Sequence, residues 1–175
     1  NSCLQALYNA GRIRSYLLND AACHTIGPFH CSLAQLFARM EHESQQRLIR
    51  SSHYGVIRPR EFICLFRERR ADFTMGEHDA HEFVTILLEM LHQEANQANG
   101  NGKVWSTIPE PKNRSEAWRF HCAHIDDSYW SRLLMGQMES ALTCAVCGNQ
   151  SLSWSAIWQL QVDLQLSDDL KSKRR

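Results

Sequence analysis

The chain has 175 residues, a length that fits one domain or part of a large one. Apolar residues make up 43% of the sequence and charged residues 22%, so a globular core can form and general disorder is excluded. The 19 basic and 19 acidic side chains cancel, which leaves no net charge to attract nucleic acid or an anionic membrane. No apolar run reaches the roughly 18 residues of a membrane span, and we expect no signal peptide. We therefore expect an intracellular protein, cytoplasmic or nuclear, with neither nucleic acid nor membrane among its partners.

The two ends of the sequence look like cut ends. It opens on Asn1-Ser2-Cys3 without an initiator Met, and apolar residues at helical spacing follow at once. It closes on a basic tail soon after a strand-like stretch. These features predict that the chain is a fragment of a longer protein.

Helical spacing dominates the first part of the chain. Residues 4–18 place apolar side chains at helical intervals that Gly11 interrupts, and residues 33–40 form a second apolar stripe. Residues 44–55 are polar and predict a loop. Pro59 predicts the start of a short helix, because its ring fixes φ for the first turn.

The strongest amphipathic pattern predicts a helix over residues 79–95. A connector rich in Asn and Gly follows at residues 96–102. A shorter helix is expected over residues 115–122, with Ser115 as its N-cap.

Strand patterns replace helical ones beyond Gly136. Short apolar runs at residues 138–143 and 152–154 are separated by turn residues. Residues 160–166 alternate apolar and polar side chains with the period of a half-buried strand. Helices first and strands last, without βαβ alternation, predict an α+β fold.

The seven cysteines are odd in number and scattered, unlike a secreted disulfide scaffold. Cys144 and Cys147 have a spacing with chemistry of its own, because two thiolates on a tight turn can face one zinc ion. A structural zinc site needs four ligands. Its other two can be Cys122 and His124, or a second Cys-x-x-Cys pair beyond Arg175. A redox pair and two ordinary loop thiols are further interpretations.

Ionisable side chains gather at the expected start of the helix over residues 79–95, namely Glu77, His78, Asp79, His81 and Glu82. The zinc-protease motif needs two His four positions apart, so this spacing excludes it. Asp79 as N-cap with Glu82 three positions later resembles a capping box. Two carboxylates exposed at a helix start can also bind a basic peptide.

Cys3 is a candidate catalytic nucleophile, because cysteine proteases use a Cys together with a His that follows later in the sequence. The nine His lie mostly in polar or loop surroundings, however, and spacing alone identifies none of them as a general base.

Several segments, taken in order, resemble the ubiquitin-specific proteases, papain-like cysteine hydrolases that remove ubiquitin. Asn1-Ser2-Cys3-Leu4-Gln5-Ala6-Leu7 is similar to the end of the family's Cys box, and residues 33–37 are similar to the helix that follows. Residues 76–83 resemble its Gln-Gln/His-Asp-Ala-x-Glu-Phe box. Residues 133–147, with the strand that ends at Leu164, resemble the stretch entering the fingers.

This resemblance implies a partial ubiquitin-specific protease catalytic domain over residues 1–175. Residues 1–122 would form a helical thumb, and residues 123–175 would begin the fingers and palm strands. The implied partners are ubiquitin and ubiquitinated proteins. The implied activity is cleavage of the isopeptide bond after the C-terminal glycine of ubiquitin. A non-catalytic ubiquitin-binding or zinc-binding module is the alternative.

The register of the resemblance also bears on the catalytic residues. It implies a nucleophilic Cys three residues before Asn1 and a general-base His beyond Arg175, so we expect this chain alone to be inactive. A rival register makes Cys3 the nucleophile. It requires Asn and Gln at two positions where the chain has Ala6 and Ala10, so we favour the first register.

The resemblance implies ubiquitin contacts from Glu77, His78, Asp79 and Glu82. Of these, Asp79 and Glu82 should face the basic C-terminal tail of ubiquitin. Glu77 replaces the family's first Gln, and a carboxylate cannot donate the hydrogen bonds of an amide at neutral pH. Cys144 and Cys147 are implied as half of a structural zinc site at the finger tips.

Overall fold

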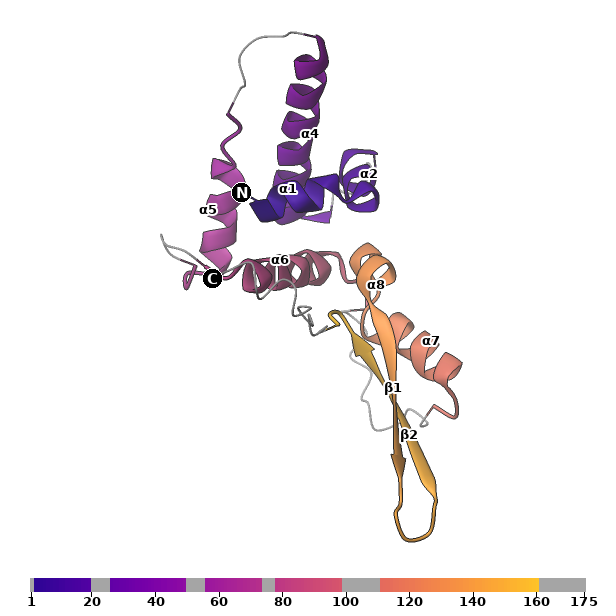
Figure 1. The fold of residues 1–175 in the computed structure, drawn as a ribbon. Helices are drawn as coiled ribbons and strands as arrows, with labels where there is room; N and C mark the ends of the chain where they lie inside the picture. Colours follow the sequence, from indigo (N-terminus) through magenta and orange to yellow (C-terminus); the bar gives the residue numbers. More distant parts are fainter. Residues whose placement is uncertain (1, 20–25, 50–55, 74–77, 99–110, 161–175) are drawn as a thin grey trace, which may run out of the picture.

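The computed structural model describes residues 2–19, 26–49, 56–73, 78–98 and 111–160. Within these ranges helices come first and a two-stranded sheet comes last (Figure 1). The helices are α1 (Ser2–Asn9), α2 (Gly11–Asn19), α4 (Pro28–Ile49), α5 (Arg60–Arg69), α6 (Ala80–Ala95), α7 (Arg114–His124) and α8 (Tyr129–Leu134). Strands β1 (Gly136–Thr143) and β2 (Gln150–Ile157) pair antiparallel, with Gly136 opposite Ile157 and Thr143 opposite Gln150. The fold is α+β, as the sequence predicts.

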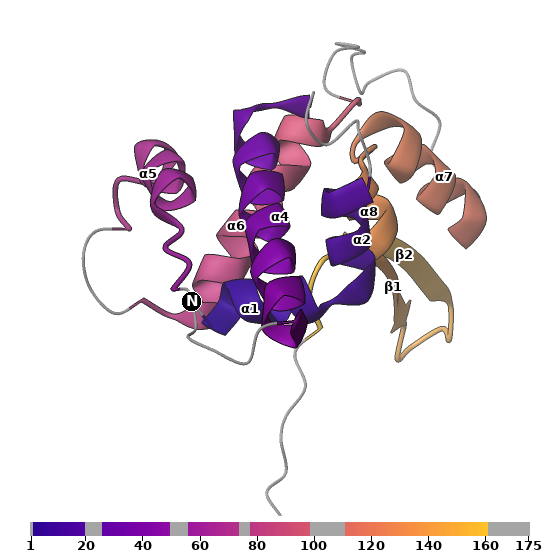
Figure 2. The same ribbon diagram turned by 90° about the horizontal axis from the view of Figure 1, so that it is seen from above.

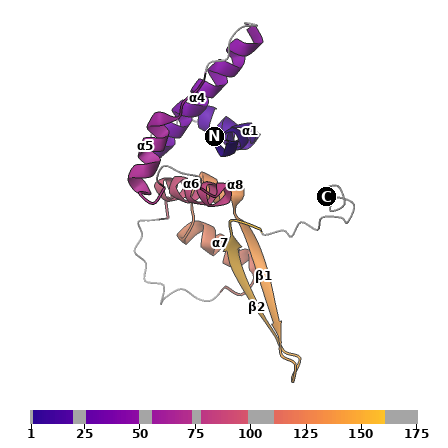
Figure 3. The ribbon, with the colours of Figure 1, turned by 60° about the vertical axis from the view of Figure 1, so that its left-hand side comes forward.

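The long helix α4 lies at the centre of the helical part of the molecule. It lies between α5 on one side and α2 on the other, and α6 passes its N-terminal end (Figure 1, Figure 2). The hairpin of β1 and β2 extends away from the helices, with α7 beside its base (Figure 3).

Six of the helices, all except α7, contribute to one apolar core. The largest fully buried side chains are Phe29 and Phe37 of α4, Phe62 and Phe66 of α5, and Trp130 of α8. The hairpin contributes little, because every residue from 138 to 153 is exposed. An isolated two-stranded hairpin is at best marginally stable in water. The helices therefore have a core of their own, whereas the hairpin depends on other contacts.

The carboxylate of Glu94, near the end of α6, caps the beginning of α4. Its two oxygens accept hydrogen bonds from the backbone N–H groups of Phe29 at 3.2 Å and His30 at 2.8 Å. Arg69 of α5 donates to the same carboxylate at 2.9 Å. The first N–H groups of a helix have no partner within it, so a carboxylate from another helix satisfies them and complements the helix dipole.

The imidazole of His30 extends this contact into the core. It is fully buried, its Nδ1 lies 2.8 Å from Glu94 Oε2, and its Nε2 accepts from the indole N–H of Trp130 at 2.7 Å. The indole can only donate, so Nδ1 carries the proton and donates to Glu94. Burial lowers the pKa of His30 despite the neighbouring carboxylate. Burial alone would raise the pKa of Glu94, but hydrogen bonds from His30, Arg69 and Phe29 outweigh it and keep this pKa below its usual range.

Gly27 makes this close approach possible. A Cβ atom at this position would lie 2.2 Å from Cδ of Glu94, and four hydrogen bonds hold that carboxylate in place. A glycine immediately before α4 is therefore a steric requirement for the Glu94 cap.

A second polar network joins α6, α7 and α8. Asp126, between α7 and α8, accepts from Nε2 of His92 at 2.9 Å and from Nε2 of His121 at 2.7 Å. Nδ1 of His92 lies 2.7 Å from the hydroxyl of Ser128, which caps α8 through a reciprocal capping box with Ser131. The network fixes the turn from which α8, and then β1, continue.

The helix α4 is longer than the sequence predicts. The predicted loop at residues 44–55 is wrong as far as Ile49, because α4 continues to that residue. Side-chain hydrogen bonds between Glu41 and Gln45 and between His42 and Gln46, four positions apart, support this polar part of the helix.

The N-cap of α7 is Asn113, whose side chain accepts from the N–H of Glu116, so the predicted Ser115 cap is also wrong. The short helix α8 was not predicted, and it lies beyond the boundary expected at residue 122. The strand expected over residues 160–166 lies outside the described residues except for Leu160. No helix of the described residues is long and apolar enough to cross a membrane.

We predict that Glu94→Gln lowers the free energy of unfolding by about 2–4 kcal/mol, because an amide cannot accept from all the donors that face this buried carboxylate. Urea unfolding followed by circular dichroism measures the change. Glu89→Gln is the matched control, since Glu89 is exposed on the same helix and should tolerate the substitution. Equal stability of the two variants would show that the Glu94 cap does not hold the helices together.

Candidate functional site

The first turn of α6 carries the acidic residues that the sequence singles out. Asp79 has an extended backbone, and its Oδ1 accepts from the N–H groups of His81 at 2.6 Å and Glu82 at 3.3 Å. The predicted N-cap is confirmed. Both hydrogen bonds end on Oδ1, so the cap does not use Oδ2. A negative side chain at this position also complements the positive end of the helix dipole.

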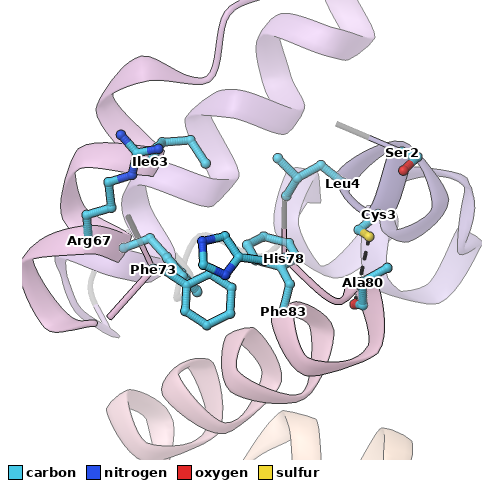
Figure 4. A pocket seen from close by; sticks show the side chains of 10 residues that line it. Ser2, Cys3, Leu4, Ile63, Arg67, Phe73, His78, Ala80 and Phe83 are labelled. Atoms are coloured by element: carbon cyan, nitrogen blue, oxygen red, sulfur yellow. Dashed lines mark hydrogen bonds between the residues drawn. The ribbon is translucent and has the colours of Figure 1, made fainter. Parts of the chain in front are cut away.

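A cleft of about 270 Å³ lies beside this turn, between α1, α5 and α6 (Figure 4). Most of its lining is apolar, and a few polar side chains contribute the remainder. The lining residues are Leu4, Ile63, Phe66, Phe73, Ala80 and Phe83, together with Ser2, Cys3, Arg67 and His78. A mainly apolar cleft with a few polar groups is typical of a ligand-binding site.

His78 and Phe73 form part of the cleft lining as a stacked pair. Their ring centroids lie 4.3 Å apart with an angle of 24° between the planes, and Figure 4 shows the two rings against each other. Phe73 is buried and His78 is exposed, so the stack joins the core to the surface of the cleft.

Of the four predicted ubiquitin-binding residues, three precede α6 in the sequence and Glu82 lies in its first turn. Glu77 lies outside the described residues. His78 lines the cleft, and Asp79 and Glu82 are exposed at the helix start next to it. The structure thus brings the three described residues to one end of α6, and their contact with ubiquitin stays a prediction.

Cys3 lies on the first turn of α1 and lines the same cleft. Its thiol donates a long contact of 3.9 Å to the carbonyl oxygen of Ala80, shown as a dashed line in Figure 4. A carbonyl oxygen is not a general base, so Ala80 does not provide the basic partner that a catalytic thiol requires. The contact instead links α1 to the start of α6.

The tip of the hairpin places Cys144 and Cys147 on a tight turn. The N–H of Gly148 donates to the carbonyl of Cys144 at 2.9 Å, and Gly148 has a φ of +71°, which favours glycine. The backbone N–H groups of Cys147 and Val146, followed by the Cys147 thiol, lower the pKa of Cys144. The turn therefore stabilises a thiolate, which is the form that binds zinc.

A tetrahedral zinc site needs four ligands, so these two thiols would be half of the predicted set, and zinc binding stays a prediction. In the described part of the chain, no group of three or more His, Cys, Asp or Glu residues is placed to hold a metal ion. Cys122 and His124 lie on α7, and the hairpin tip projects well beyond this helix (Figure 1). Cys122 and His124 therefore do not complete a four-ligand site with Cys144 and Cys147 in this structure.

Sequence reasoning missed the cleft itself. Arg67 and Phe73 belong to no motif, and they meet residues of α1 and α6 only through the packing of α5. The apolar spacing of α5 predicts a buried face, but it does not show what that face meets.

Comparison with known proteins identifies the family of this chain. A family model described as "Ubiquitin carboxyl-terminal hydrolase" matches residues 1–169. The chain belongs to this family. The resemblance to the ubiquitin-specific proteases is thereby confirmed over nearly the whole sequence.

Several relatives of this hydrolase family align along the chain. Ubiquitin carboxyl-terminal hydrolase 2 from Rattus norvegicus is 29% identical over 172 residues, which cover 94% of this chain and 27% of that protein. The Homo sapiens hydrolase 2 is likewise 29% identical, with 94% and 28% covered. Ubiquitin carboxyl-terminal hydrolase 19 from Homo sapiens is 27% identical over 175 residues, with 94% and 13% covered. The chain thus spans less than a third of the length of each of these three relatives.

Proposed function

We propose that this chain contributes to the catalytic domain of a deubiquitinating thiol hydrolase, which cleaves the isopeptide bond after the C-terminal glycine of ubiquitin. One observation carries the proposal: the first turn of α6 presents two exposed carboxylates beside a mainly apolar cleft. Membership of the ubiquitin carboxyl-terminal hydrolase family supports ubiquitin as the protein that this turn contacts.

The proposed contact is between Asp79 and Glu82 and the basic C-terminal tail of ubiquitin. Asp79 uses only Oδ1 for the helix cap, so Oδ2 can accept from an arginine. Glu82 is exposed one turn further along α6. The helix dipole also favours negative charge at this end of α6.

In a thiol hydrolase a thiolate attacks the carbonyl carbon, a His assists, and N–H donors hold the oxyanion. We do not assign the attack to Cys3, because its contact with the Ala80 carbonyl provides no base and the family register places the nucleophile elsewhere. The chain of 175 residues should therefore not hydrolyse ubiquitin conjugates by itself.

A ubiquitin probe with a C-terminal electrophile tests the proposed activity. We predict that it labels the full-length protein, that Cys3→Ser is labelled equally, and that the 175-residue chain is not labelled. Ubiquitin without the electrophile is the matched control. Labelling of the 175-residue chain at Cys3 would overturn the assignment of the nucleophile. Failure to label the full-length protein would favour a non-catalytic ubiquitin-binding module.

We predict that Asp79→Asn/Glu82→Gln weakens the binding of ubiquitin to the full-length protein about tenfold or more, because two charge-assisted pairs are lost. Isothermal titration calorimetry measures the affinity. Asn is as good an N-cap as Asp, so the melting temperature should change little.

Two controls separate this contact from a general effect of charge. Glu89→Gln, on the same helix, should bind ubiquitin as the wild type does. Ubiquitin without its basic C-terminal tail should not distinguish the wild type from the double variant. Equal affinity of both proteins for intact ubiquitin would show that the two carboxylates serve only the helix.

We further propose that Cys144 and Cys147 provide half of a structural zinc site, with two ligands from outside the described residues. Two thiols on a turn that stabilises the thiolate of Cys144 fit zinc chemistry. The hairpin buries too little apolar surface to stabilise its own tip, and a bound metal ion would supply that stability.

We predict that the full-length protein contains zinc and that Cys144→Ser lowers both its zinc content and its melting temperature. Metal analysis by mass spectrometry and a thermal melt measure these quantities. Cys64→Ser is the matched control, because Cys64 is an exposed thiol on α5. Zinc absent from the wild type, with melting unchanged in Cys144→Ser, would reduce the pair to ordinary loop thiols. Loss of zinc in Cys122→Ser would identify that residue as a ligand instead.

A further inference from the structure

Three phenylalanine rings that line the cleft form a cluster. Phe66 of α5 meets Phe73 edge to face at a centroid distance of 5.3 Å and meets Phe83 of α6 at 5.1 Å. Phe73 and Phe83 lie 6.4 Å apart. Such pairs stabilise their geometry beyond simple burial, so the cluster forms a rigid support between α5 and α6.

A hydrogen-bonded turn after α5 also holds Phe73 in this cluster. Its N–H donates to the carbonyl of Arg70 at 3.0 Å, which closes a turn after α5. Arg70 binds Asp72 through two hydrogen bonds, of 2.9 Å and 2.6 Å, and its guanidinium lies 5.8 Å from the centre of the Phe73 ring. The hydrogen bonds from Arg70 are the main cause that lowers the pKa of Asp72 to about 2. The ion pair between Arg70 and Asp72 therefore persists at neutral pH, and it stabilises the turn that holds the Phe73 ring.

The stack of Phe73 on His78 connects the aromatic cluster to the first turn of α6, where Asp79 and Glu82 lie. His78 is exposed and directly precedes Asp79, so its backbone sets where the N-cap begins. A carboxylate must be oriented before binding if it is to pair with an arginine at low entropic cost.

We propose that Phe73 is a positioning residue for ubiquitin binding: through its stack with His78 it orients Asp79 and Glu82 toward the ubiquitin tail. This inference rests on the proposed contact of the acidic pair. It assigns a role in recognition to a buried ring that contacts no substrate itself.

The test measures ubiquitin affinity of full-length variants by calorimetry. Phe73→Leu keeps an apolar side chain but removes the ring stack, and it should weaken binding about three- to tenfold. Phe73→Tyr keeps the ring and should restore the affinity of the wild type. Phe62→Leu is the matched control, because it removes a buried α5 ring that stacks on Phe29 instead, and it should lower stability without changing the affinity.

A double-mutant cycle distinguishes positioning from a general loss of stability. In the Asp79→Asn/Glu82→Gln background, Phe73→Leu should cause no further loss of affinity. An equal loss in that background would overturn the positioning role. Weaker binding by the acidic-pair variant, with none by Phe73→Leu, would overturn this inference alone. Unchanged binding in both would overturn the proposed ubiquitin contact as well.

Discussion

The carboxylate of Glu94 is the contact on which the arrangement of the helices depends. It lies near the end of α6, caps the first turn of α4, pairs with Arg69 of α5 and, through the imidazole of His30, reaches the indole of Trp130 on α8. One buried anion therefore links four helices. Ionic groups in a core are stable only when donors surround them, and here the donors come from the start of α4 and from Arg69 of α5. Gly27 leaves the space that this arrangement needs.

The candidate site lies at the other end of the same helix. A helix of 16 residues is about 24 Å long, and its hydrogen bonds make it stiff over that distance. Fixing α6 at Glu94 therefore also fixes the direction of its first turn, where Asp79 and Glu82 are exposed. The aromatic cluster of Phe66, Phe73 and Phe83 restrains that first turn locally. Two contacts thus restrain α6, the Glu94 cap near its C-terminal end and the aromatic cluster beside its first turn.

The hairpin is stabilised in a different way from the helices. Its base follows α8 directly, and the network of His92, Asp126 and His121 fixes the turn before that helix. Further along, both strands are exposed and contribute no side chain to the core. The Cys-x-x-Cys turn lies where apolar burial is smallest. A metal ion is a physical solution to this problem, since ligand bonds can replace the burial that two strands cannot achieve.

The sequence by itself determined the α+β class, the helix that begins after Asp79, the strands around the Cys-x-x-Cys turn and the resemblance to the ubiquitin-specific proteases. These features depend on local spacing, capping residues and short motifs, which are readable without knowledge of distant contacts. The full length of α4 and the Asn113 cap were missed, because several polar residues near a boundary are compatible with either state and only side-chain pairing selects one. Only the tertiary structure decided that Glu94 meets His30 and that Phe73 supports His78. Residues 64 positions apart, such as Glu94 and His30, leave no periodic signal in the sequence, and their pairing depends on how the helices pack.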